Sequence, residues 1–411
     1  MKRRDRTAST TIVIVGAGQA GVRAAFALRE HGFDGRVILI GNEGQAPYQR
    51  PPLSKAFLAG HLSVDRLYLH LPQAFAAHAI ELKLHTDVEA IDRASAQLRL
   101  RGGGRLGYDK LLLATGCRPR ELQCPGARSP GVHYLRTLQD AMRLRESLTR
   151  GRRVAIVGGG YIGLEVAAVA ASQGAVVTVV EAERVLLSRV TTPIVGEFFA
   201  AAHRRHDVRV ICDARATAFL GDERLHEVAT DTGAIRADLA IVGVGALPNE
   251  ELARAAGLRC DDGIVVDAHC RTSDPAIFAA GDCASAVDEL SGRRVRHESV
   301  QNAIDQATAA ARNLAGEATR YAAVPWFWSN QYEYKLQIAG TFVGHDEVVE
   351  RGNRAAGSFA LLYRRRGALI GVDAVNMPRE YMAARRELAH ALAARADARP
   401  VHAGVAQAQA A

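Results

Sequence analysis

The sequence contains no long apolar run. None of its 411 residues lies in a stretch of about 18 consecutive apolar residues, the length that a membrane-spanning helix needs. The segment from Met1 to Thr11 is basic and polar and lacks the apolar core of a secretory signal. We therefore expect a cytoplasmic protein that binds no membrane. Residues 1–10 and the Ala- and Gln-rich residues 396–411 are expected to be disordered.

The sequence also lacks close-spaced cysteines. None of its six cysteines forms a C-x-x-C pair. Scattered cysteines in a chain without a secretion signal are typical of reduced thiols, so we expect neither disulfides nor a metal site. The six are Cys117, Cys124, Cys212, Cys260, Cys270 and Cys283.

Signatures of nucleic-acid binding are missing as well, although the formal net charge is +8. No zinc finger, helix-turn-helix or RNP motif accompanies the basic residues, which argues against a nucleic-acid partner. The excess positive charge is either a solvated surface or a field that steers an acidic partner.

A glycine-rich turn follows the first apolar run of the chain. Ile12 to Val15 is apolar, Gly16-Ala17-Gly18-Gln19-Ala20-Gly21 follows directly, and a helical pattern begins after it. In such a G-x-G-x-x-G turn, the first glycine permits a tight bend, the second lets the backbone approach a pyrophosphate, and the third allows close helix–strand packing. The pyrophosphate then lies at the helix N-terminus, where free N–H groups favour negative charge.

The same order of strand, glycine turn and helix recurs in the middle of the chain. Val154 to Val157 is apolar and Gly158-Gly159-Gly160-Tyr161-Ile162-Gly163 is the turn. Two such turns, each between a strand and a helix, indicate an internal repeat of a dinucleotide-binding unit. The sequence therefore predicts two bound dinucleotides.

The residue that ends the second strand of each unit discriminates between dinucleotides. In the second unit it is Glu181, whose carboxylate accepts hydrogen bonds from ribose hydroxyls and repels a 2′-phosphate. NADH is therefore favoured over NADPH, although Arg184 nearby would weaken the preference. In the first unit the corresponding stretch is Gly41-Asn42-Glu43.

Further strand-like runs predict an α/β protein with two Rossmann-like domains and a small third domain. From about Val324 aromatic residues cluster, and alternating apolar runs precede a helix at 378–395, which is typical of an α+β unit. The expected domains are 11–118 with 246–322 (FAD-binding, discontinuous), 119–245 (NAD-binding) and 323–395 (C-terminal, α+β).

A flavin with a nicotinamide is the pair that two dinucleotide units suggest. The nicotinamide delivers a hydride, and the protein supplies orientation and electrostatics. Dithiol-relay reductases pass the electrons on through a cysteine pair beside the flavin. This chain has no such pair, so the electrons are expected to leave the flavin directly.

Five distinctive strings are spread along the chain. They are Pro47-Tyr48-Gln49-Arg50-Pro51-Pro52-Leu53-Ser54-Lys55, Ala114-Thr115-Gly116-Cys117-Arg118-Pro119-Arg120, Leu135-Arg136-Thr137-Leu138-Gln139-Asp140-Ala141, Glu298-Ser299-Val300-Gln301-Asn302-Ala303 and Val324-Pro325-Trp326-Phe327-Trp328-Ser329. With these strings the chain resembles the oxygenase-coupled ferredoxin reductase family over about residues 11–395. The resemblance implies a glutathione-reductase-like fold, bound FAD, NADH as donor, and an acidic 2Fe–2S ferredoxin as acceptor. That ferredoxin would serve a cytochrome P450 or a Rieske-type oxygenase.

The same resemblance implies residue roles. Lys55 would lie by the flavin N5, Glu165 would face the nicotinamide, and Trp328 would lie near the flavin at the ferredoxin-facing surface. The residues implied for FAD are Gly16, Ala17, Gly18, Gly21, Asn42, Glu43, Arg50, Lys55, Val88, Arg136, Asp282 and Val300. Those implied for NAD are Gly158, Gly160, Tyr161, Ile162, Gly163, Glu181 and Gly245.

Two positions depart from the family pattern. The family usually has a carboxylate at Asn42, where it binds the FAD ribose, so either Asn42 or Glu43 would make that contact here. Asn330 replaces an aspartate of the aromatic string and removes a negative charge near the expected electron exit.

Other functions remain open from the sequence. They are a rubredoxin reductase or nitrite-reductase electron module, a redox-sensing protein like apoptosis-inducing factor, and an NADH oxidase or peroxide reductase. The last requires a redox cysteine between Asn42 and Lys55, and that stretch contains none.

Overall fold

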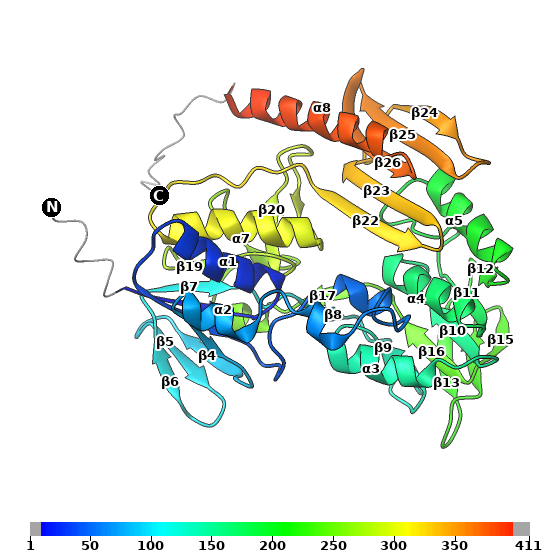
Figure 1. Cartoon of the computed structure of the whole chain (residues 1–411), viewed down its shortest axis with the longest axis horizontal. Coiled ribbons are helices and arrows are strands. Elements are labelled where there is room, and N and C mark those ends of the chain that lie inside the picture. Colours follow the sequence, from blue (N-terminus) through cyan, green and yellow to red (C-terminus); the bar gives the residue numbers. More distant parts are fainter. Residues whose placement is uncertain (1–9, 398–411) are drawn as a thin grey trace, which may run out of the picture.

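The structure, a computed structural model, describes residues 10–397 and arranges them around three five-stranded sheets (Figure 1). The disorder expected for residues 1–10 and 396–411 falls almost wholly outside the described residues. Residues 396 and 397 are described, and they belong to helix α8 (Pro378–Asp397), which is longer than predicted. Within the described range no helix is both long and apolar enough to cross a membrane.

The first sheet is parallel, with strand order β19-β7-β1-β2-β3. Four of its strands come from the first third of the chain, whereas β19 comes from much later in the sequence. The strands are β1 (Thr11–Val15), β2 (Arg36–Ile40), β3 (Ile80–Lys83), β7 (Lys110–Leu113) and β19 (Ile277–Ala279).

Both faces of the first sheet are buried, which explains why its strands are continuous apolar runs. On one face, Ile12 and Ile14 pack with the buried alanines of α1 (Gln19–Glu30) and α7 (Val300–Leu314), and the two helices contact each other. On the other face, Val13 and neighbouring residues form a second core. The sheet therefore holds the first glycine turn between rigid elements.

The second sheet repeats this arrangement, with order β12-β11-β10-β16-β9 and parallel pairing throughout. The internal repeat predicted from the two glycine turns is thus visible as two similar sheets (Figure 1). The strands are β9 (Val132–Tyr134), β10 (Arg153–Val157), β11 (Val176–Val180), β12 (Arg209–Ile211) and β16 (Leu239–Val242).

Three helices accompany the second sheet. Helix α4 (Tyr161–Ser172) begins within the second glycine turn. Two further helices, α3 (Leu138–Ser147) and α5 (Pro193–Arg205), were not predicted from the sequence. Helix α3 has a capping box, in which the Thr137 hydroxyl accepts from the Asp140 amide and the Asp140 carboxylate accepts from the Thr137 amide. That local signal could have located its start.

The chain passes from the first parallel sheet to the second and later returns, and the two connecting segments lie side by side. Strand β8 (Cys117–Pro119) leads out of the first sheet and β17 (Ala246–Pro248) leads back, and the two pair antiparallel. The side chain of Asn249 strengthens the crossing, because its Nδ2 donates to the Thr115 carbonyl at 2.8 Å. This pair fixes the two glycine turns relative to each other.

The third sheet is antiparallel, with order β22-β23-β26-β25-β24, and α8 packs on β26 and β23. The predicted small α+β unit is therefore present. Its other face packs on α5, where Phe198 and Phe199 join Leu336 and Phe359 in one core. The strands are β22 (Trp326–Gln331), β23 (Tyr334–Gly340), β24 (Glu347–Asn353), β25 (Ser358–Arg365) and β26 (Ala368–Val375).

Shorter elements, most of them not predicted from the sequence, decorate the parallel sheets. They are η1 (Pro51–Ser54), η2 (Val64–Leu67), α2 (Pro72–Ala77), α6 (Glu251–Ala255), β4 (Val88–Asp92), β5 (Gln97–Leu100), β6 (Arg105–Gly107), β13 (Ala216–Leu220), β14 (Glu227–Thr230), β15 (Gly233–Arg236), β18 (Ile264–Val265), β20 (Ala284–Val287) and β21 (Arg294–Val295).

Candidate active site

The first glycine turn forms a cradle at the start of α1. Gly16 has φ +115°, and a Cβ there would lie 2.1 Å from the Ala114 carbonyl oxygen, so only glycine fits. Gly18 is the N-cap of α1 and has no side-chain cap, and a Cβ on it would meet nothing within 4 Å. The helix therefore presents free backbone N–H groups to open space, as a pyrophosphate site requires.

The second turn has the same construction. Gly158 has φ +107°, and a Cβ there would lie 2.4 Å from the Gly243 carbonyl oxygen. Gly160 caps α4 without a side-chain hydrogen bond, and its hypothetical Cβ is 3.8 Å from the nearest atom. Neither α1 nor α4 has an acidic residue in its first turn that would repel a phosphate. Both turns therefore fit a dinucleotide.

Two of the residues expected to bind cofactor do not face the cavity. A Cβ on Gly21 would lie 1.8 Å from the Gly16 carbonyl oxygen, and one on Gly163 would lie 2.3 Å from that of Gly158. These third glycines let each helix pack tightly on its turn. They shape the cradle from behind, whereas the expectation placed them among the ligand contacts.

One cavity of about 1640 Å³ joins the two turns and reaches the third domain. All the other residues expected at the site line it, namely Gly16, Ala17, Gly18, Asn42, Glu43, Arg50, Lys55, Val88, Arg136, Asp282, Val300, Gly158, Gly160, Tyr161, Ile162, Glu165, Glu181, Gly245 and Trp328.

Glu43 is occupied by neighbouring side chains. Its Oε1 accepts from Arg50 Nη2 at 2.5 Å and its Oε2 accepts from the Tyr48 hydroxyl. Tyr48 OH also accepts from the Leu138 amide at 2.9 Å. Burial and the adjacent Glu43 raise the pKa of Tyr48 to about 12, although Arg50 opposes the shift, so the phenol stays protonated. The neighbouring Asn42 is exposed.

Lys55 and Glu165 form an ion pair on the cavity wall. Lys55 Nζ lies 2.5 Å from Glu165 Oε2 and 3.1 Å from the Pro51 carbonyl oxygen. The Ser54 hydroxyl donates to the same Glu165 Oε2 at 2.5 Å. Glu165 is 2% exposed, so these donors replace the water that a buried carboxylate has lost. Ser329 donates to the other oxygen, Oε1, at 2.7 Å.

Asp282 accepts hydrogen bonds from two residues near the point where the crossing strands β8 and β17 meet the first sheet. Arg136 Nη2 lies 3.1 Å from Asp282 Oδ2, and Cys117 Sγ donates to the same oxygen at 3.2 Å. Burial, and then the negative charge of Asp282, raise the pKa of the Cys117 thiol. Among the described residues that line the cavity, Cys117 is the only cysteine, and it is a protonated hydrogen-bond donor.

Glu181 is fixed by the backbone of its own unit. Its Oε2 accepts from the Gly159 amide at 2.5 Å and its Oε1 from the Glu183 amide at 2.8 Å. Arg184, expected to weaken the preference for NADH, does not line the cavity, whereas Arg189 and Arg215 do. These two backbone donors fix the Glu181 carboxylate on the cavity wall.

Aromatic residues of β22 form the wall that faces the second glycine turn. The rings of Phe327 and Tyr161 lie 4.4 Å apart, and those of Trp326 and Trp328 lie 5.7 Å apart. Asn330 is exposed and lies outside the cavity lining. The change from the family's aspartate therefore affects the outer surface of β22 and leaves the cavity itself unchanged.

Sequence reasoning missed several polar residues that hold the site together. They are Tyr48, Ser54, Cys117, Ser329 and Gln331. The first four lie within the strings that resemble the family. Their positions in the sequence therefore stood out, but nothing indicated which residues they contact. Those partners are more than 80 residues away in most cases.

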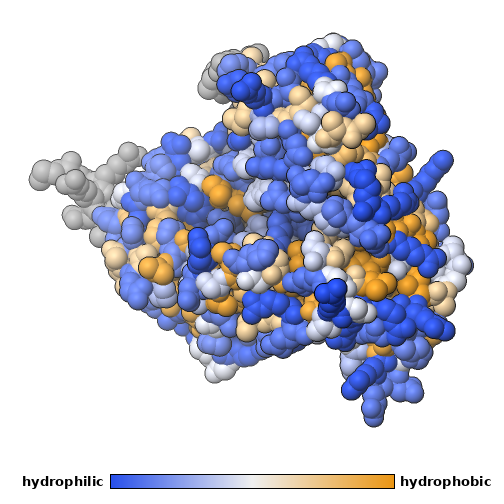
Figure 2. Space-filling model, turned by 45° about the vertical axis from the view of Figure 1, so that its right-hand side comes forward, coloured by the Kyte–Doolittle hydropathy of each residue, from blue (hydrophilic) through white to orange (hydrophobic). Residues whose placement is uncertain are grey.

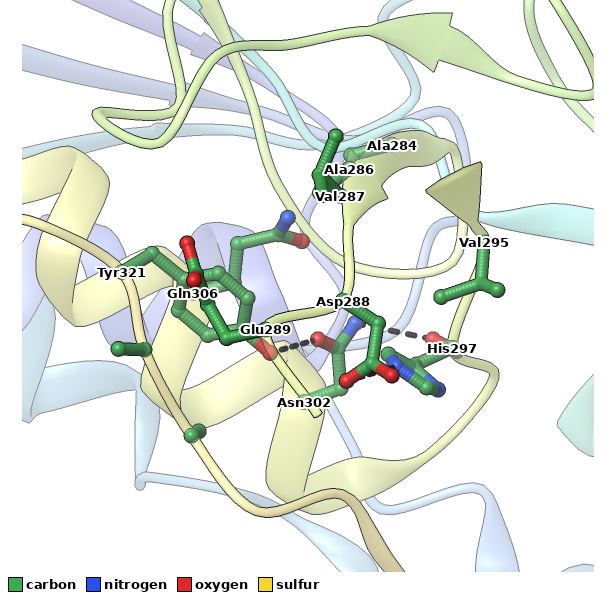
Figure 3. A pocket seen from close by; sticks show the side chains of 12 residues that line it. Ala284, Ala286, Val287, Asp288, Glu289, Val295, His297, Asn302, Gln306 and Tyr321 are labelled. Carbon is green, nitrogen blue, oxygen red and sulfur yellow. Dashed lines mark hydrogen bonds and ion pairs between the residues drawn. The ribbon is translucent and has the colours of Figure 1, made fainter. Parts of the chain in front are cut away.

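A second, much smaller pocket lies between α7 and strands β20 and β21 (Figure 3). Its volume is about 10 Å³, roughly that of one water molecule. The Tyr321 hydroxyl donates to Asn302 Oδ1 at 2.6 Å on its wall. Burial raises the pKa of Asp288, but hydrogen bonds from His297 and Ser291 outweigh it and lower the pKa. This pocket is too small for a cofactor.

Polar residues cover most of the face shown in Figure 2 and separate the apolar groups from one another.

Over residues 10–397, no group of three or more His, Cys, Asp or Glu side chains is placed to hold a metal ion.

Comparison with known protein families gives two matches along the chain. Residues 10–307 match the model of the pyridine nucleotide-disulphide oxidoreductases, and residues 326–401 match a model described as reductase C-terminal. The boundary between them lies just before β22, where the third sheet begins.

Individual proteins resemble the chain over nearly its whole length. Rhodocoxin reductase of Rhodococcus erythropolis is 45% identical over 92% of this chain and 89% of its own. The anthranilate 1,2-dioxygenase system ferredoxin–NAD(+) reductase component of Burkholderia cepacia is 44% identical over 92% of this chain and 93% of its own. A chain in the crystal structure of the covalent putidaredoxin reductase–putidaredoxin complex has a TM-score of 0.90 at 42% identity, covering 93% of both chains.

Proposed function

The chain belongs to the pyridine nucleotide-disulphide oxidoreductase family, and on that premise we propose that it is an FAD-dependent NADH:ferredoxin reductase. Electrons pass from NADH through FAD to a 2Fe–2S ferredoxin, which serves a cytochrome P450 or a Rieske-type oxygenase. Relatives named as reductases of a rhodocoxin, a putidaredoxin and a dioxygenase system support this acceptor.

One observation carries the proposal. A single cavity joins two glycine cradles and contains the Lys55–Glu165 pair, and its one cysteine among the described residues is bound to Asp282. A disulphide-reducing enzyme needs a cysteine pair at this place. The arrangement therefore favours electrons that leave the flavin without a thiol relay.

We assign FAD to the first cradle and NADH to the second. Gly16, Ala17 and Gly18 would hold the FAD pyrophosphate, and Asn42 its ribose. Val88 would meet the adenine end, and Arg136, Asp282 and Val300 the flavin half. Gly160, Tyr161, Ile162, Glu181 and Gly245 would hold NADH. When bound, FAD accepts two electrons from NADH and releases them one at a time, which is the chemistry that the reaction needs.

Lys55 and Glu165 would serve the reacting ends of both cofactors. The ammonium group of Lys55 places a positive charge on the cavity wall, where it would stabilise negative charge on a flavin bound there. Glu165 holds that ammonium at 2.5 Å and so determines where the charge lies. The aromatic residues of β22, Trp328 among them, line the same cavity.

The acceptor that fits this chain best is acidic. The formal net charge of +8 attracts a negatively charged partner and raises the rate of encounter. The third domain borders the cavity through β22, so we place the electron exit there.

We also propose the domain boundaries predicted from the sequence, with residues 11–118 and 246–322 as one FAD-binding domain. The paired crossing strands β8 and β17, at 117–119 and 246–248, support them.

A cytoplasmic location is supported by the six free cysteines, three of them buried, which suit a reducing compartment.

Stopped-flow spectroscopy tests the function with putidaredoxin as the 2Fe–2S probe and a rubredoxin as the mononuclear-iron probe. We expect NADH to bleach the flavin and putidaredoxin to reoxidise it faster than an artificial dye does. Faster reoxidation by rubredoxin would favour a rubredoxin reductase. A bleached enzyme that persists with both probes, in a long-lived complex with NAD⁺, would favour a redox sensor.

A further inference from the structure

Glu165 receives hydrogen bonds from two parts of the molecule, the end of η1 and strand β22. Lys55 and Ser54, at the end of η1, both bind its Oε2, and Ser329 of β22 binds its Oε1. Glu165 itself lies on α4 of the second domain. Among the described residues, only the Ser329 hydroxyl donates a hydrogen bond to Oε1.

Ser329 is in turn held by residues that lead away from the cavity. Gln331 Nε2 donates to Ser329 Oγ at 3.2 Å, and Gln331 Oε1 lies 3.0 Å from His203 Nε2 on α5. His203 Nδ1 lies 3.1 Å from the Tyr332 hydroxyl. Ser329, Gln331 and His203 are at most 1% exposed. A continuous buried chain of hydrogen bonds therefore runs from the tip of the β22–β23 hairpin to Glu165.

The donors in this chain all point in one direction. The Gln331 amide donates with its nitrogen to Ser329, so its oxygen accepts from His203 Nε2–H. His203 Nδ1 is then an acceptor for the Tyr332 hydroxyl. A neutral imidazole satisfies both contacts, and burial lowers the pKa of His203 to about 4, which keeps the ring neutral at physiological pH.

Tyr332 anchors the outer end of the chain. Its ring stacks on His206 with centroids 3.7 Å apart and an interplanar angle of 7°, and it meets His203 edge-on at 5.1 Å. Tyr332 has φ +54° at the tip of the hairpin, and its ring contacts His203 of α5 and His206, the C-cap residue of that helix. The hairpin of the third domain is thus clamped on a helix of the second.

The chain does not conduct protons. An amide in the path would have to be protonated on its oxygen and lose a proton from its nitrogen, and the carboxamide of Gln331 is a poor base. What the chain can transmit is position, because Ser329, Gln331 and His203 are buried and each is hydrogen-bonded to its neighbours in the chain.

We propose that Ser329 is a positioning residue, held by Gln331 and His203, which orients Glu165 and through it the Lys55 ammonium. The proposal rests on the reductase function above. The geometry of the charged pair at the flavin site then depends on the clamp between the β22–β23 hairpin and α5. Loss of the Ser329 hydroxyl leaves a buried carboxylate oxygen without its donor and lets the pair reorient.

The test compares Ser329→Ala with Ser329→Thr, which keeps a hydroxyl, in the FAD-loaded enzyme. We expect Ser329→Ala to slow the limiting rate of flavin reduction by NADH roughly 5- to 10-fold, the effect of one typical intramolecular hydrogen bond. The apparent Kd for NADH should change less than about twofold, because the cradle at Gly160 is untouched. The visible spectrum of the bound flavin should shift, and Ser329→Thr should restore both rate and spectrum.

Ser358→Ala is the matched control, since Ser358 lies on β25 of the same sheet, outside the cavity, and its Oγ is 3.4 Å from the Asn376 carbonyl oxygen. It should leave rate and spectrum unchanged. If Ser329→Ala does not fold or retain FAD, Gln331→Met tests the next link and should slow reduction in the same direction by a smaller factor.

Three outcomes separate the possibilities. Flavin reduction at the wild-type rate in both Ser329→Ala and Gln331→Met overturns the positioning role. An unchanged reduction rate with a larger solvent isotope effect on flavin reoxidation also overturns it, because the chain would then carry protons. Failure of the wild-type enzyme to be reduced by NADH contradicts the proposed function instead.

Discussion

Lys55 Nζ lies 2.5 Å from Glu165 Oε2, although the two residues are 110 positions apart in the chain. Their side chains differ in burial, with 19% of Lys55 and 3% of Glu165 exposed. The ammonium can therefore still contact water, whereas the carboxylate cannot. This asymmetry decides what happens when either partner is removed.

Lys55→Met should destabilise the protein more than Glu165→Gln does. Removing the lysine leaves a buried carboxylate with only two hydroxyl donors, at a cost of about 3–5 kcal/mol, whereas Glu165→Gln leaves an ammonium that solvent can reach. The double variant should be less destabilised than the sum of the two, because it contains no unpaired buried charge. Urea unfolding with excess FAD measures the three free energies. Additive losses would show that the pair contributes no coupling.

Asp373 makes stability depend on pH. The residue is 1% exposed, and its Oδ2 accepts from the Tyr363 hydroxyl at 2.6 Å and from the Thr191 hydroxyl. Burial raises its pKa to about 6, although both hydroxyls oppose the shift. Between pH 4 and pH 6 the unfolded chain therefore loses a proton that the folded chain keeps. Folding stability falls as pH rises through this range, and the loss is complete above the folded-state pKa.

Asp373→Asn should remove this dependence, because the amide oxygen still accepts both hydroxyl hydrogen bonds. The stability of the variant relative to wild type should rise by about 2–3 kcal/mol from pH 4 to pH 7. Urea unfolding across that range measures it, with the exposed Asp65→Asn as control. A difference that is flat with pH would show that Asp373 is ionised in the fold throughout.

Asn42→Asp should tighten FAD binding. Asn42 is exposed at the cavity edge, and Glu43 is already engaged by Arg50 and Tyr48. A carboxylate at 42 accepts hydrogen bonds from the ribose hydroxyls more strongly than an amide does, so the Kd for FAD should fall roughly 3- to 10-fold. Fluorescence titration of apoprotein with FAD measures it. Gln49→Glu, an exposed change outside the cavity lining, should leave the Kd unchanged.

Thiol labelling should distinguish two groups of cysteines. Cys117, Cys270 and Cys283 are buried, and burial raises the pKa of each thiol. Cys124, Cys212 and Cys260 are half-buried and should react first with iodoacetamide at pH 8, because the thiolate is the reactive form. Mass spectrometry of the native protein gives the order. Rapid labelling of Cys117 would show that it is a thiolate and would reopen a role for it in electron transfer.

The sequence by itself determined the local features of this protein. The spacing of Gly16, Gly18, Gly158 and Gly160 predicted two dinucleotide cradles, because a tight turn between strand and helix tolerates no other side chain at its first position. Apolar runs predicted the parallel strands, and the aromatic cluster after Val324 marked the third domain. Each of these signals lies within a few consecutive residues of the sequence.

Only the tertiary structure decided which side chains meet. Nothing in the local pattern indicates that Glu43 is taken by Arg50 and Tyr48, or that Ser329 completes the hydrogen bonds of Glu165. Gly21 and Gly163, expected among the ligand contacts, pack against their own turns, as the third glycine of the motif does. The contact between Ser329 and Glu165 joins residues 164 positions apart in the chain, and it depends on how the third sheet is placed beside the cavity. That placement is fixed by packing, such as that of the third sheet on α5, which local residue spacing does not encode.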